Sequence, residues 1–176
     1  MRYSKNYYET TFQYELSQKF RYLDTEQLFR LKKTVLSATS KDFSTGKKLA
    51  FSLFFQMYTG QRSKLTSSNA DSTKLGRRVM KGDPVGYKLT LRGKEFFMFF
   101  QKIVDKSGGE LKYASTNSLK NNHCNSYSFK VKNILSFSKM ENHYKYMRTL
   151  SDLHVCLVTE ANNSEELNFF SRTFKL

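Results

Sequence analysis

Residues 87–93 read Tyr87-Lys88-Leu89-Thr90-Leu91-Arg92-Gly93, and they are the most informative residues for the fold class. A strand places alternate side chains on opposite faces, so Lys88, Thr90 and Arg92 share one face and the two leucines share the other. Gly93 then turns the chain into a helix with an apolar face of Phe96, Phe99, Phe100 and Ile103. The stretch therefore predicts a sheet with a polar, basic face and an apolar face covered by a helix.

The same alternation returns at residues 126–132. There Ser126, Ser128, Lys130 and Lys132 face away from Tyr127, Phe129 and Val131. Apolar spacing predicts helices over 6–23, between Ser44 and Gly60, and after Glu165 and Glu166, which suit the N-terminal end of a helix. Further strands are expected at 31–38, within 61–76, at 78–80 and at 153–159, with a loop over 107–125. These elements predict an α+β fold, an antiparallel sheet with helices packed on one face and an open basic face.

Length and composition limit the domain organisation and the possible functions of the chain. The chain has 176 residues, 30 Lys and Arg against 15 Asp and Glu, and an aromatic content of 15%, which excludes intrinsic disorder. We expect one domain over 1–176, because no linker or repeat is visible. A net charge of +15 suits a polyanionic partner, although a lysine-rich edge can also serve only to prevent aggregation. Because Glu141 is the only acid between Lys112 and Lys145, nucleic acid is the favoured partner.

Membrane and targeting signals are not expected. No run of 18 apolar residues exists, and residues 1–20 contain Glu9 and Glu15 and lack an apolar core. Cys124 and Cys156 are expected to be reduced thiols.

Catalytic chemistry is not expected either. The sequence has no nucleophile elbow, phosphate-binding glycine loop or paired acids, and its isolated aspartates Asp71, Asp83 and Asp105 suit turns. His154 and Cys156 would share a strand face, but the His and Cys spacing matches no common zinc pattern. We predict that the protein is not an enzyme and binds no metal and no cofactor.

Several motifs resemble the large ribosomal subunit protein five family, which binds 5S rRNA in the central protuberance. Gly60-Gln61-Arg62 is similar to the family's Gly-Gln-Lys-Pro turn, and 82–93 to its Gly-x-Pro-Ile-Gly-x-Lys-Val-Thr-Leu-Arg-Gly. Residues 125–128 resemble its Gly-Asn-Tyr-Ser element, and 153–161 its final strand. The resemblance covers 19–176 and leaves 1–18 as a helical N-terminal extension. It implies a ferredoxin-like or RNA-recognition type of sheet.

The resemblance also implies functional residues. It assigns Ser37, Gln61, Thr90 and Arg92 to the 5S rRNA surface, to which we add the basic residues Arg62, Lys64, Lys88, Lys130 and Lys132. A loop near P-site tRNA would include Ser67, Ser68, Asn69 and Lys74. A bridge to a small-subunit head protein would include Lys139, Asn142, Lys145 and Arg148. Other proteins of the central protuberance would be neighbours.

The chain departs from the family pattern at three of these places. Ser37-Ala38-Thr39 replaces Asn-Met-Gly, residues 66–71 are nearly uncharged where the family has a basic loop, and Phe137-Ser138-Lys139 replaces Phe-Pro-Glu. This drift, with many Lys, Asn, Phe and Tyr residues and few Pro and Gly, suggests a mitochondrial ribosome in the mitochondrial matrix. A ribosome in a bacterial cytoplasm is the alternative.

The leading hypothesis is a structural, rRNA-binding constituent of the large ribosomal subunit that acts in translation. The runner-up is a free-standing RNA-binding module of the RNA-recognition type, which would need base-stacking aromatic residues on the open face. A basic nuclease, the third hypothesis, would need a carboxylate cluster.

Overall fold

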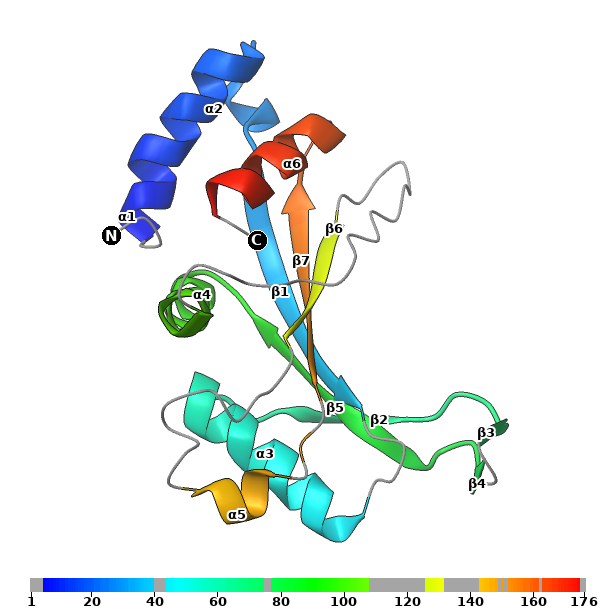
Figure 1. Ribbon diagram of the computed structural model, residues 1–176. Helices are drawn as coiled ribbons and strands as arrows, with labels where there is room; N and C mark the ends of the chain where they lie inside the picture. The colour runs from blue at the N-terminus through cyan, green and yellow to red at the C-terminus, as the bar shows by residue number, and fades with distance from the viewer. Residues whose placement is uncertain are drawn as a thin grey trace. The chain divides into compact units, whose positions relative to one another are not determined.

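The structure is a computed structural model that describes residues 5–39, 44–74, 77–107, 126–131, 143–148, 150, 152–161 and 163–174. The helices are α1 (Lys5–Tyr7), the π-helical turn η1 (Tyr8–Phe12), α2 (Gln13–Phe20), the 3-10 turn η2 (Thr25–Gln27), α3 (Thr45–Thr59), α4 (Lys94–Ser107), α5 (Tyr144–Met147) and α6 (Ser164–Thr173). The strands are β1 (Arg30–Thr39), β2 (Lys64–Ser67), β3 (Ser72–Lys74), β4 (Arg77–Val79), β5 (Pro84–Leu91), β6 (Ser126–Val131) and β7 (Leu153–Glu160). Figure 1 shows these elements along the chain.

Five of the strands form one sheet in the order β2-β5-β1-β7-β6, and β3 and β4 form a separate two-stranded sheet. β2 pairs antiparallel with β5, and β3 with β4. Buried and half-buried side chains alternate along β6 from Ser126 to Val131, as expected for a sheet packed on one face. The predicted α+β class is confirmed.

The chain divides into two compact units. Unit 1 consists of Met1–Val35, Thr90–Val131 and Val155–Leu176, and unit 2 of Leu36–Leu89 and Lys132–His154. The expectation of a single domain over 1–176 therefore stays a prediction, and each unit is described by itself.

Unit 1 is held together by aromatic side chains. Phe12 of η1 is fully buried, and its ring lies 5.2 Å from Phe174 and 5.6 Å from Phe170, between ring centroids. The same ring lies 6.0 Å from Phe29, just before β1, and Phe100 of α4 lies 5.8 Å from Phe174. Edge-to-face and offset pairs of this kind each add about 0.5–1.5 kcal/mol beyond the burial of their area. The N-terminal helices are therefore packed into the core of unit 1.

Unit 2 is built on α3, which buries Ala50, Phe51, Phe54, Phe55 and Tyr58. The helix ends where predicted, at Gly60, whose φ of 77° is a left-handed conformation that glycine adopts without strain. Gly86 in β5 is required for space instead. A Cβ at this position would meet the backbone of the neighbouring strand, including the carbonyl oxygen of Ala38 and the Cα of Thr39 at 3.2 Å.

Two expectations need adjustment. β5 begins at Pro84, three residues before the predicted start, because a proline is tolerated at the first position of a strand. A serine before a helix is expected to cap it through its hydroxyl, but the hydroxyl of Ser44 makes no capping hydrogen bond, although this residue precedes α3 in an extended conformation. Glu165 and Glu166 lie in the first turn of α6, as predicted, and Glu166 is buried there, with 1% of its surface exposed. The predicted loop at 107–125 lies outside the described residues, apart from Ser107 in α4.

Candidate nucleic-acid interface

Two predicted RNA-binding lysines lie opposite each other in unit 2. Lys64 of β2 is the Cα partner of Lys88 of β5 in the antiparallel ladder, and both residues are exposed. Directly opposed residues have Cβ atoms about 4.5–5.5 Å apart, and like charges in these positions destabilise a sheet. This arrangement concentrates positive charge on neighbouring strands, where an anion would relieve the repulsion.

The turn before β2 presents further polar groups. Gly60 donates its N–H to the carbonyl of Gln56 at 3.0 Å, and Gln61 donates its N–H to the Thr59 hydroxyl at 3.2 Å. Arg62 follows as an exposed residue, two positions before the first lysine of β2. The turn is therefore fixed by its own hydrogen bonds, and Arg62 adds a further exposed cation just before β2. Ser37 lies half-buried on β1, the strand next to β5.

Three of the predicted residues lie in unit 1. Thr90 is half-buried near the end of β5, and Arg92 is exposed just before Gly93, whose φ of 55° lets the chain turn into α4. Lys130 is half-buried on β6, on the face of Ser126 and Ser128, as predicted. Lys132 lies outside the described residues.

The predicted tRNA-proximal loop has a defined backbone. Ser67 ends β2 at an irregularity in the register, and Ser68 exchanges two backbone hydrogen bonds with the turn before β5, one with Asp83 and one with Gly82, both at 2.9 Å. The hydroxyl of Ser68 donates to the carbonyl of Ala70 at 2.6 Å, and Asn69 is exposed. Lys74 lies in β3 opposite Arg77.

The predicted bridge residues are only partly described. Lys145 lies in α5 and Arg148 directly follows it, and both are exposed. The backbone N–H of Arg148 donates to the carbonyl of Tyr144 at 2.9 Å, which fixes its position at the helix end. Lys139 and Asn142 lie outside the described residues.

Asp71 and Asp83 of unit 2 act as turn residues. The Asp71 carboxylate accepts the N–H of Lys81 at 2.7 Å, and the Asp83 carboxylate accepts the N–H of Met80 at 2.9 Å. The predicted role of these two is confirmed, whereas Asp105, the third aspartate assigned to a turn, lies within α4 near its end. Within the described residues no group of three His, Cys, Asp or Glu side chains could hold a metal ion. No described helix is long and apolar enough to cross a membrane.

Sequence reasoning missed a second basic group, at the start of β1 in unit 1. Arg30 and Lys33 line a cavity together with Arg92. The run Arg30-Leu31-Lys32-Lys33 was a visible signal, but its proximity to Arg92 depends on the pairing of strands far apart in sequence.

Known proteins that are similar to this chain share one family name, although no protein-family model matches the chain. The large ribosomal subunit protein uL5 of Borreliella afzelii is 27% identical over 163 residues, covering 92% of this chain and 88% of that protein. A protein named uL5m from Reclinomonas americana is 22% identical over 175 residues, covering 98% and 95% of the two chains. A uL5 protein from Nostoc is 28% identical over 165 residues, covering 92% and 88%. Because the second alignment covers 98% of this chain, it includes most of the N-terminal helical segment.

Proposed function

Since this chain is a homologue of the uL5 proteins of the large ribosomal subunit, we propose that it is a structural, rRNA-binding constituent of that subunit. The relatives are named as ribosomal proteins, in agreement with the prediction that the chain is not an enzyme. Its role would be to hold a folded RNA in place, with 5S rRNA or its equivalent in the central protuberance as the partner.

The observation that carries the proposal is the pair of opposed lysines on β2 and β5. Lys64 and Lys88 are exposed, and neither forms an ion pair with a described residue. An RNA phosphate near both ammonium groups would replace their repulsion by two attractions and would release counterions. With a net charge of +15, the whole chain would favour such a partner.

The other predicted contacts belong to the same proposal. Ser37, Gln61, Thr90 and Arg92 would contribute hydrogen-bond donors and acceptors beside the lysines, to phosphates, sugars or base edges. Contact of residues 66–74 with P-site tRNA would rely on hydroxyl and amide groups, because residues 66–70 carry no charged side chain. Lys145 and Arg148 would meet an acidic surface of a small-subunit head protein.

We also propose that the ribosome concerned is mitochondrial. The uL5m relative aligns over 98% of the chain at 22% identity, and the bacterial relatives align over 92% at 27–28% identity. The bacterial alternative therefore stays open to test.

The proposal is tested by purifying the tagged chain from its source, separating complexes on a sucrose gradient with magnesium, and sequencing the bound RNA. We expect it to sediment with the large subunit and to carry large-subunit rRNA, with a 5S-like RNA if that ribosome has one. Mitochondrial or bacterial rRNA sequences would identify the compartment. Recovery in light fractions with other RNAs would favour a free-standing RNA-binding module, and recovery without RNA would contradict the proposal.

A further inference from the structure

Unit 1 contains a cavity of about 250 Å³ between the N-terminal helices, the start of β1 and the start of α4. Pockets for drug-sized ligands have volumes of roughly 300–1,000 Å³, so this one suits a smaller group. Its size fits a flat, single aromatic ring system such as one nucleobase.

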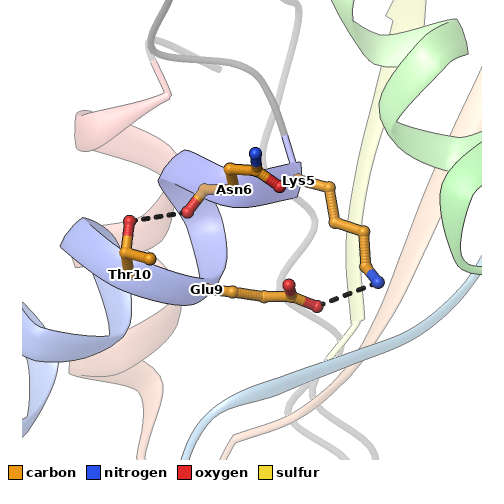
Figure 2. Close-up of polar contacts among 4 residues, drawn as sticks. All are labelled: Lys5, Asn6, Glu9 and Thr10. Carbon is orange, nitrogen blue, oxygen red and sulfur yellow. Dashed lines mark hydrogen bonds and ion pairs between the residues drawn. The ribbon is translucent and has the colours of Figure 1, made fainter.

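The lining of the cavity is strongly cationic. It includes five basic residues, Lys5, Arg30, Lys32, Lys33 and Arg92, and one acidic residue, Glu9. The Glu9 carboxylate is 3.2 Å from the ammonium of Lys5, one helical turn away, and Figure 2 shows these two side chains pointing toward each other. Lys32 forms an ion pair with Glu160 of β7. These pairings leave Arg30, Lys33 and Arg92 without an ion pair to any described residue.

One side of the cavity is aromatic and held in place by hydrogen bonds. The Tyr8 hydroxyl donates to the carbonyl of Phe29 at 3.2 Å and accepts the N–H of Leu31 at 3.1 Å, so its ring cannot turn away. That ring lies 5.3 Å from the ring of Phe97, between centroids. Tyr8 is buried, whereas Phe97 is half-buried and lines the cavity, so Phe97 offers the accessible ring surface.

We propose that this cavity receives one unstacked nucleotide of the bound RNA, with its base against Phe97 and its phosphate beside Arg30 and Lys33. Sequence-specific RNA recognition mostly uses unpaired bases that are turned out and stacked on aromatic side chains. Every base has a π-face suited to this contact, and a phosphate suits the neighbouring cations. The proposal rests on the proposed function, since it adds an unpaired nucleotide to an RNA ligand held elsewhere by Lys64 and Lys88.

The proposal predicts a preference for single-stranded RNA that depends on one ring. We compare the wild type with Phe97→Leu, which removes the aromatic face and keeps an apolar side chain. The probes are a nine-nucleotide single strand of mixed sequence and the same strand annealed as a duplex. Phe97→Leu should weaken binding of the single strand about fivefold or more, the lower end of what stacking one base contributes, and leave duplex binding within about twofold.

Matched lysine variants test the phosphate half of the site. Lys33 lines the cavity, whereas Lys94 at the start of α4 is exposed and does not line it. Lys33→Gln should weaken single-strand binding more than Lys94→Gln, although both remove one positive charge.

A crosslinking measurement on the wild-type protein does not depend on whether a variant folds. A single strand carrying 5-iodouridine, irradiated in the complex and digested, should give a crosslink that mass spectrometry locates at Phe97. A crosslink elsewhere, or an equal effect of Phe97→Leu on single strand and duplex, would overturn the nucleotide site. If the nucleotide site fails these tests but Lys64→Gln and Lys88→Gln still weaken rRNA binding, the proposed function stands without the nucleotide site. If the wild type binds no RNA, both fail.

Discussion

Replacing both opposed lysines by glutamine should change stability and RNA binding in opposite directions. In the free protein, Lys64 and Lys88 repel each other across the β2–β5 ladder. Relieving a directly opposed like-charge pair is worth about 0.2–1 kcal/mol, so the double variant should be more stable by about that amount. In the complex, the same two ammonium groups would be the ones that contact phosphate.

The expected loss of binding follows from counterion release. Log K falls as log salt concentration rises, and each phosphate contact makes this slope steeper by about 0.7–0.9. Losing two contacts therefore makes the slope shallower by about 1.4–1.8. Between 50 and 200 mM salt, the wild type should therefore lose about 7–12-fold more affinity than the double variant does. Filter binding with rRNA from the source ribosome measures the slope, and urea unfolding of the free protein measures stability.

Two controls isolate the pair from net charge. The variant Lys81→Gln with Lys94→Gln removes the same charge from two exposed lysines that have no predicted RNA role. The single variants of Lys64 and Lys88 complete a double-mutant cycle, in which the coupling free energy should be repulsive. If the pair variant and the control show the same salt slope, the lysines do not contact phosphate and the reasoning is refuted.

Three further substitutions test the fold. Gly86→Ala should destabilise the protein by about 1–3 kcal/mol in urea unfolding, because its Cβ would overlap the Ala38 carbonyl. Gly46→Ala is its control, since α3 leaves that position open, and it should stabilise by about 0.5–1 kcal/mol; equal effects would contradict the steric argument. Phe12→Ala should cost about 3–5 kcal/mol, measured by thermal or urea unfolding, and a cost below 1 kcal/mol would show that the N-terminal helices are not part of the core. Tyr8→Phe should cost about 1–3 kcal/mol, because a carbonyl before β1 and an N–H within it lose their partner. Burial raises the pKa of Tyr8 from 10.0 to about 12, so its contribution to stability is fully present below pH 10 and is lost between pH 10 and 12. Unfolding measured across that range should show a smaller loss for Tyr8→Phe than for the wild type, and identical pH profiles would contradict the burial of the phenol.

Patterns within a few neighbouring residues correctly predicted those strands, helices and helix ends that depend on local backbone preferences. The alternation in residues 87–93, the change to a helix after Gly93 and the end of α3 at Gly60 all use backbone preferences of a few neighbouring residues. The same patterns assigned each strand residue to a face. They did not assign a strand to its neighbour, since a face pattern is compatible with many sheet orders.

The register of the strands and the burial of individual side chains depend on pairs of residues far apart in sequence. The register that opposes Lys64 to Lys88 is set by the β2–β5 ladder and its irregularity at Thr66 and Ser67. The acidic first turn predicted for Glu165 and Glu166 is confirmed, but the burial of Glu166 does not follow from the local sequence. Burial raises the pKa of Tyr22, and the Glu166 carboxylate raises it further, although Tyr22 follows α2 and Glu166 lies in α6. No local pattern could show that electrostatic effect.

The positions of the acidic groups add more to the functional argument than net charge does. Many surfaces are basic, but here several described carboxylates are committed to structure. Asp71 and Asp83 accept backbone N–H groups in turns, and Glu9 and Glu160 pair with lysines on neighbouring elements. The opposed lysines of β2 and β5 have no ion pair to a described residue, although one carboxylate between them would relieve their repulsion. A protein that used these lysines only for solubility would gain stability from such a carboxylate. A protein that binds RNA would lose affinity from it, so the arrangement favours the RNA-binding role.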